Sequence, residues 1–129
     1  AGEVSFLGKV GREELPVLVG GSHIYISAVP TDGVSASLLE AMAVGAFPVV
    51  TDNEPNRLWV KDGENGILFS PNEAVALSKA IRRAWEDTAL RSRARHRNRE
   101  IIAERASWDA NMATIAERYR HLVAQERNA

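Results

Sequence analysis

Short apolar runs alternate with amphipathic segments along the first half of the chain, and glycine, proline or asparagine separates most of them. Four of these runs are rich in β-branched and aromatic residues and are too short for stable helices. We therefore predict four strands, at residues 4–10, 23–29, 47–52 and 67–69. The first of them is expected to lie in the core.

Apolar residues at helical spacing fill the intervals between these runs. A short helix is predicted to stop at Gly20 and Gly21, since glycine is a poor helix former. A second helix is predicted to begin near Ser35, between positions 34 and 37, and to end at Gly45. The segment 55–66 is predicted to be a loop with one helical turn.

Beyond Pro71 the strand pattern stops and charged amphipathic segments follow. We predict three helices here, over residues 72–87, 88–105 and 107–126, with Ser107 as the N-cap of the last. Residues 1–70 are therefore the expected α/β core, and residues 71–129 the expected C-terminal helices.

Alternating strands and helices are typical of a parallel sheet covered by helices, so we predict the α/β class with three layers. Three or four strands form a short sheet, whereas doubly wound domains usually have more. We therefore expect an incomplete Rossmann-like domain whose missing strands precede Ala1. The stretch from Val4 to Gly8 would then be an exposed sheet edge, open to self-association.

The composition argues against several classes of function. The 129 residues with 45% hydrophobic content suit one domain with a core. Because 16 Lys and Arg balance 17 Asp and Glu, the net charge predicts no nucleic-acid partner. The absence of cysteine excludes disulfides and thiolate chemistry. The three histidines are too far apart in sequence for a metal motif, so no metal site is predicted.

No apolar run reaches the ~18 residues of a membrane span, and the first residues do not resemble a signal peptide. We therefore expect a cytoplasmic protein. Five arginines lie between Arg91 and Arg99. They are interpreted as a solvated helix face or, alternatively, as a peripheral contact with the anionic inner surface of a membrane. Nucleic-acid binding is less favoured, because no aromatic residues are interleaved with the arginines.

The stretch "DGVSASLLEAMAVG", residues 32–45, carries the candidate chemistry. A strand is predicted before it and a helix within it, and parallel sheets bind ligands at the carboxyl ends of their strands. The first N–H groups of such a helix lack partners and favour an anion. Gly33 allows close approach to the backbone, and Ser35 and Ser37 add hydroxyl donors. A diphosphate fits this description.

The two acids of the stretch have structural interpretations as well as functional ones. Ser37 and Glu40 match the capping box, in which the carboxylate would bond a free N–H of the first turn. Asp32 alone is typical of a turn residue. Spacing by itself does not decide between these interpretations and ligand binding.

The sequence resembles a known family over residues 4–69, and more loosely through the helices that follow. The match centres on the pattern D-G-x5-L-E-A-M-A-x-G of residues 32–45, preceded by "FLGKV" and followed by "FPVVTDNEPNRLWVKDGENGILF". These segments resemble the C-terminal half-domain of retaining GT-B glycosyltransferases of the glycogen-synthase-like and sucrose-synthase-like group. The first acid of the family pattern is usually Glu and is Asp32 here.

The resemblance implies roles for particular residues. Asp32 would be catalytic, facing the donor sugar near the bond that breaks. Glu40 would accept hydrogen bonds from the ribose hydroxyls, and the backbone at Lys9 and Val10 would meet the base. The full set of implied substrate-binding residues is Gly33, Val34, Ser35, Ser37, Leu38, Glu40, Lys9 and Val10.

The resemblance also implies an activity: transfer of a sugar from a nucleoside-diphosphate-sugar donor to an acceptor, with retention of configuration and with no cofactor or metal besides the donor. The family's basic Arg and Lys pair and its acceptor-binding N-terminal domain would precede Ala1. We therefore expect this chain alone to be inactive. The alternative is a nucleotide- or partner-binding Rossmann-like module without catalysis.

Overall fold

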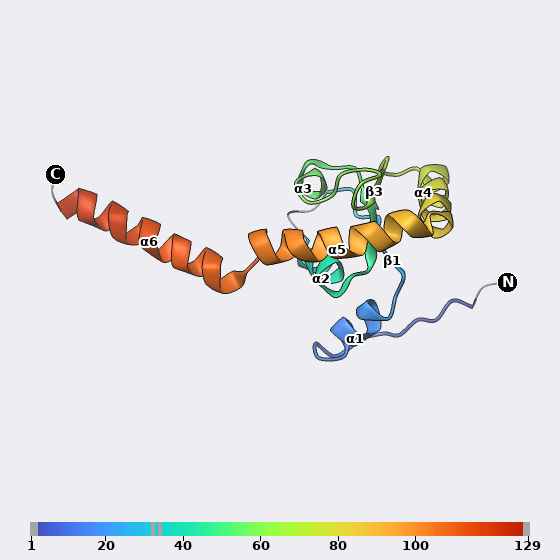
Figure 1. Ribbon diagram of the computed structural model, residues 1–129, viewed down its shortest axis with the longest axis horizontal. Helices are drawn as coiled ribbons and strands as arrows, with labels where there is room; N and C mark the ends of the chain where they lie inside the picture. The colour runs from blue at the N-terminus through green and yellow to red at the C-terminus, as the bar shows by residue number, and fades with distance from the viewer. Residues whose placement is uncertain (1–2, 32, 34, 128–129) are drawn as a thin grey trace.

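The computed structural model describes residues 3–31, 33 and 35–127. Its elements follow one another as shown in Figure 1. They are α1 (Leu15–Gly20), β1 (Ile24–Ser27), α2 (Ala36–Val44), β2 (Phe47–Thr51), α3 (Glu54–Arg57), β3 (Ile67–Phe69), α4 (Ala74–Glu86), α5 (Thr88–Arg105) and α6 (Trp108–Arg127). The predicted α/β class is confirmed, with helices at most of the predicted positions.

The sheet has the order β1-β2-β3, and both strand pairs are parallel. Ile24 pairs with Phe47, and Val49 pairs with Ile67. All five residues of the central strand β2 are buried. A parallel strand covered on both faces needs apolar side chains on both, which explains the continuous apolar run of this segment.

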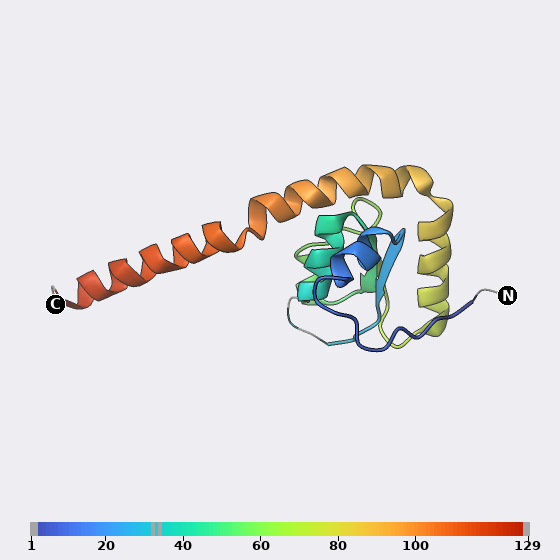
Figure 2. The same ribbon diagram turned by 90° about the horizontal axis from the view of Figure 1, so that it is seen from below.

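Helices cover the two faces of the sheet. On one face, Phe47 and Val49 of β2 pack with Ala84 of α4 and Leu90 of α5. On the other face, Val50 packs with Leu38 and Met42 of α2. Successive strand residues point to opposite faces, so β2 contributes to both clusters. Figure 2 shows α5 running along the top of the domain and α4 beside the sheet.

A buried pair of amides joins α5 to the loop before β3. Asn65 Nδ2 donates to Asn98 Oδ1 at 2.8 Å, and Asn98 Nδ2 donates to the Asn65 carbonyl at 2.9 Å. Asn98 has no exposed surface, and Asn65 is 3% exposed. Asn65 also bonds the loop itself, through the Trp59 carbonyl and the Lys61 N–H. Because buried amides must find partners, this pair fixes the position of α5.

Arginines of α5 bond carbonyl groups at the C-terminal ends of other helices. Arg91 donates to the carbonyls of the last turn of α4, Arg99 to the Val44 carbonyl at the end of α2, and Arg105 to the Leu58 carbonyl just after α3. The last carbonyls of a helix lack partners within it, and the helix dipole favours a cation there. Part of the arginine cluster is therefore structural. Its contact with a membrane stays a prediction.

The predicted strand at residues 4–10 is wrong. This segment has no regular structure, and Val4, Phe6 and Leu7 are 79%, 95% and 60% exposed. An apolar run shows that burial would be favourable, but a strand also needs a neighbour for its backbone N–H and C=O groups. None of the three described strands pairs with this segment. The predicted sheet edge from Val4 to Gly8 is therefore wrong as well.

The outer strands of the described sheet are β1 and β3. Half-exposed Ile26 lies on β1. An outer strand leaves one row of backbone groups without a ladder partner, which is the feature that promotes association of sheets. Self-association stays a prediction, and it applies to these strands in place of residues 4–8.

Helix α6 runs away from the rest of the domain in both ribbon views (Figures 1 and 2). Ser107 Oγ accepts from the Ala110 N–H at 3.4 Å, which confirms the predicted N-cap. Trp108, Ile115 and Tyr119 are exposed along this helix. Within residues 3–31, 33 and 35–127, no helix combines the length and the apolarity that crossing a membrane requires.

We expect Asn98→Ala to lower the free energy of unfolding by about 2–4 kcal/mol, because it leaves buried polar groups of Asn65 without partners and opens a small cavity. Arg93→Ala, on an exposed position of the same helix, serves as the control and should change stability by less than about 0.5 kcal/mol. Urea unfolding of both variants measures the difference. Equal stability of the two variants would contradict the role of the amide pair.

Candidate functional site

The candidate site lies where β1 and β2 end. Thr51 Oγ1 donates to the Ser27 carbonyl at 3.4 Å, so the carboxyl ends of the two strands lie side by side. The chain then leads from β1 into α2, whose N-cap is Ser35. This confirms the predicted start of the helix. Ser37 is exposed and Ser35 half-buried, so the N-terminus of α2 is open to solvent, as expected.

A chain of three hydroxyls supports this helix end. Tyr25 Oη lies 2.8 Å from Ser37 Oγ, and Ser37 Oγ lies 2.9 Å from Ser35 Oγ. Ser35 gives α2 no side-chain cap, because its hydroxyl bonds Ser37 instead. The first turn of α2 is therefore not closed by its own N-cap side chain, which leaves its N-terminal N–H groups available to a ligand.

Leu38 belongs to the apolar face of α2. Its side chain is buried against β2, and its N–H donates to the Ser35 carbonyl at 3.1 Å. Leu38 thus anchors α2 in the core. Gly33 is exposed, and a side chain added there would meet no atom within 4 Å. Asp32 and Val34, predicted as catalytic and substrate-binding, lie outside the described residues.

The predicted capping box of Ser37 and Glu40 is wrong. The N-cap is Ser35, and no acid lies in the first turn of α2. A capping box needs its acid three residues after the N-cap, a position that Leu38 occupies. The N-cap is fixed by the residue at which the extended chain from β1 becomes helical, and that residue is Ser35, with φ −72° and ψ 115°. Glu40 is therefore one turn into the helix.

Glu40 lines a pocket of about 270 Å³ between α1 and α2. The walls are mainly apolar and carry four polar side chains. The apolar residues are Leu15, Pro16, Val19, Ala43 and Val44, and the polar ones are Arg12, Tyr25, Ser37 and Glu40. A small apolar cavity with a few polar side chains is typical of a site for a small molecule.

Glu40 and Ser37 line one pocket, together with Arg12 and Tyr25, which the sequence reasoning missed. Arg12 precedes a short helix and belongs to no motif, so only the packing of α1 on α2 reveals its place. Lys9 is exposed and Val10 half-buried, and neither lines this pocket.

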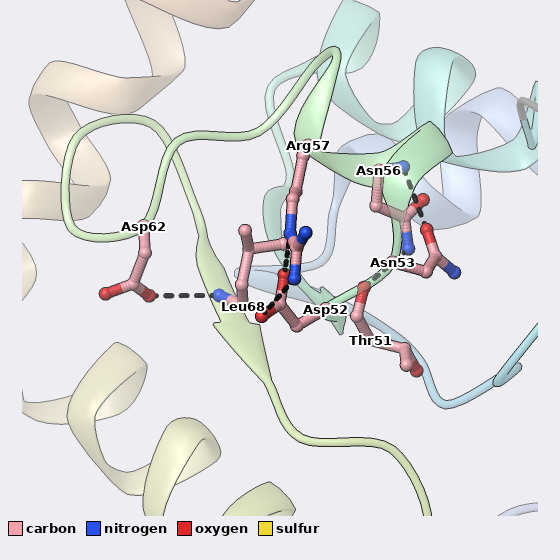
Figure 3. Close-up of polar contacts among 7 residues, drawn as sticks. All are labelled: Thr51, Asp52, Asn53, Asn56, Arg57, Asp62 and Leu68. Atoms are coloured by element: carbon pink, nitrogen blue, oxygen red, sulfur yellow. Dashed lines mark hydrogen bonds and ion pairs between the residues drawn. The ribbon is translucent and has the colours of Figure 1, made fainter.

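A second polar group follows β2 at the same edge (Figure 3). Arg57 donates to both oxygens of Asp52, with Nε–Oδ1 at 2.6 Å and Nη2–Oδ2 at 3.0 Å. The hydrogen bond from Arg57 lowers the pKa of Asp52. Asn53 Oδ1 caps α3 at the Asn56 N–H, and Asn56 Nδ2 donates to the Thr51 carbonyl. This network holds the loop after β2 rigidly beside the strand end.

Comparisons with known proteins agree with this geometry. The model of the family described as glycosyl transferases group 1 matches residues 1–101. An uncharacterized glycosyltransferase of Methanocaldococcus jannaschii is 31% identical over 121 residues, which are 93% of this chain and 31% of that protein.

Two solved structures share the fold. Sucrose-phosphate synthase from Thermosynechococcus elongatus is 26% identical with a TM-score of 0.87, over 94% of this chain and 30% of that one. Anabaena HepE, determined with UDP and separately with UDP-glucose, is 22% identical with a TM-score of 0.79, over 85% of this chain and 30% of that one. The chain thus spans about 30% of the length of these proteins.

We expect Arg57→Gln to raise the pKa of Asp52 toward its ordinary value of 3.8, because the charged donor is lost. Since the folded pKa of Asp52 is lowered, the pair stabilises the fold above about pH 4 and this contribution is lost as the pH falls through the folded pKa. The effect on stability is small, because the two side chains are 61% and 36% exposed.

An NMR titration of the Asp52 carboxyl group, in the unchanged protein and in Arg57→Gln, measures the change in its pKa. Urea unfolding of both proteins at neutral and acid pH measures the stability that the ion pair contributes. The stability difference between the two proteins should vanish in acid. An unchanged pKa of Asp52 in the variant would show that Arg57 does not hold this carboxylate.

Proposed function

The chain belongs to the glycosyl transferases group 1 family, and from this premise we propose that it forms the donor-binding part of an enzyme that transfers a sugar from a nucleoside-diphosphate sugar to an acceptor. The transfer proceeds with retention of configuration. The donor is the only small molecule required, without a further cofactor.

The N-terminus of α2 carries this proposal. It opens to solvent at the carboxyl edge of a parallel sheet, its N-cap hydroxyl bonds Ser37, and a side chain added at Gly33 would meet no atom within 4 Å. Free N–H groups and the positive end of a helix dipole suit a diphosphate. They also stabilise the negative charge that develops on the leaving diphosphate, which is the electrostatic form of catalysis.

The pocket beside this helix end supports binding of the nucleoside. Glu40 can accept hydrogen bonds from ribose hydroxyls, and the apolar walls from α1 can cover a flat base. The backbone at Lys9 and Val10 and the cation of Arg12 lie on the chain that leads into α1, so we include all three in this half of the donor site. Asp32, between β1 and α2, keeps its proposed place near the donor sugar.

The relatives support the class of donor. HepE shares this fold and was determined with UDP and with UDP-glucose. Because the chain spans about 30% of these proteins, the proposal assigns the acceptor site and the basic residues that neutralise the diphosphate to the rest of the enzyme.

In the complete enzyme, we expect Glu40→Ala to weaken UDP binding by about tenfold to a hundredfold, since a hydrogen bond to a charged group contributes about 1.5–3 kcal/mol. Glu117→Ala, an exposed carboxylate on α6, removes the same charge away from the pocket and should leave binding unchanged. Calorimetry with UDP, GDP and ADP measures both. If the Glu40→Ala enzyme bound UDP as tightly as the unchanged enzyme, Glu40 would have no role in binding the ribose.

The 129-residue chain alone should bind these nucleotides only at about millimolar concentration and transfer no sugar. Ordering the ligand costs an estimated ~4–15 kcal/mol, which two or three hydrogen bonds barely offset. The same calorimetry on this chain measures its nucleotide affinity. A sugar-transfer assay on this chain measures its activity. Micromolar binding by the chain alone would show that the groups of α1 and α2 suffice.

A further inference from the structure

A second pocket lies at the opposite end of the sheet. It has a volume of about 270 Å³ and is bounded by the end of α1, the starts of β1 and β2, and the first turns of α5. Its polar lining consists of Ser22, His23, Thr88, Arg91, Ser92 and Arg95. Because the strands are parallel, this pocket is at their amino ends, whereas the α2 N-terminus is at their carboxyl ends.

The fold holds Arg91 of this pocket in place, and Arg95 lies against Gly45. Arg91 Nη1 donates to the carbonyls of Ala84 and Trp85, and its guanidinium lies 5.7 Å from the centre of the Trp85 ring. Both bonds use the Nη1 nitrogen of Arg91. They therefore do not occupy the N–H groups of Nε and Nη2. Arg95, one turn further along α5, packs over Gly45, where an added Cβ would lie 2.8 Å from Arg95 Nε.

Hydroxyl groups accompany these cations, and none of the carboxylates that the structure describes lines the pocket. Ser22 Oγ donates its hydrogen to the Leu18 carbonyl at 3.0 Å, so this hydroxyl offers no hydrogen to an anion and the hydroxyl donors of the pocket are those of Thr88 and Ser92. Thr88 and Ser92 lie one turn apart on α5, as Arg91 and Arg95 do. Guanidinium forks and hydroxyl donors recognise phosphate oxygens, and here the fork of Arg91 is fixed by its bonds to α4.

We propose that this pocket binds a phosphate group. Its volume suits inorganic phosphate or a small phosphomonoester, and the charged headgroup of an anionic lipid offers the same chemistry. The site is separate from the donor site, and it stands whether or not the proposed transfer reaction is correct. The fold thus carries an anion site at each end of its parallel sheet.

Titration of the chain with inorganic phosphate, followed by the backbone amide signals in NMR, tests the proposal. Signals of residues 22–23 and 88–95 should shift with saturation. Arg95→Gln removes the guanidinium but keeps a side chain long enough to contact Gly45. It should weaken phosphate binding about tenfold or more. Arg97→Gln is the matched control, because Arg97 lies on the same helix, pairs with Glu100 at 3.3 Å and does not line the pocket.

Vesicles distinguish the two sources of the phosphate. Sedimentation is measured with phosphatidylcholine alone and with equal parts of phosphatidylcholine and phosphatidylglycerol. Binding to the anionic vesicles alone, lost in Arg95→Gln and kept in Arg97→Gln, identifies a lipid headgroup, whereas Arg95-dependent binding of free phosphate identifies a soluble ligand. Equal weakening by the two substitutions, shifts confined to residues 35–38, or no binding in either assay would overturn the proposal.

Discussion

The buried amide pair of Asn65 and Asn98 is the contact on which the arrangement of this domain depends. It places α5 against the loop before β3, with both amides almost out of contact with solvent. From that position α5 covers one face of the sheet with Leu90 and Ala94, and it supports the other face with Ile101 and Ile102. An unpaired buried amide is costly, so the pair restricts α5 to one position along the loop.

The arginines of α5 extend this constraint to other helices. They bond the carbonyls at the ends of α2, α3 and α4, groups that would otherwise lack partners. At the end of α2, Gly45 adopts φ 92° and lies against Arg95, so a side chain there would be strained and would clash. A charged helix thus serves as the common support for elements that approach it from both faces of the sheet.

The two proposed anion sites lie at opposite ends of the parallel sheet. At the carboxyl ends of its strands, the N-terminus of α2 and the pocket with Glu40 suit a nucleoside diphosphate. At the amino ends, Arg91 and Arg95 line a pocket whose described lining residues include no carboxylate. Helix α5 lines the second pocket and also contacts α2, because Arg99 bonds the last carbonyl of α2, the helix whose first turn belongs to the proposed donor site.

The sequence by itself determined the α/β class, the start of α2 between positions 34 and 37, its end at Gly45 and the cap at Ser107, because periodicity and capping act over a few neighbouring residues. It indicated that Glu40 belongs to a site, through the resemblance of residues 32–45 to a family. Only the tertiary structure decided that residues 4–10 form no strand, that Ser35 is the N-cap, and that Arg12 lines the pocket with Glu40. These features, like the pairing of Asp52 with Arg57, depend on which elements pack together, and contacts between separate elements leave no periodic pattern in the chain.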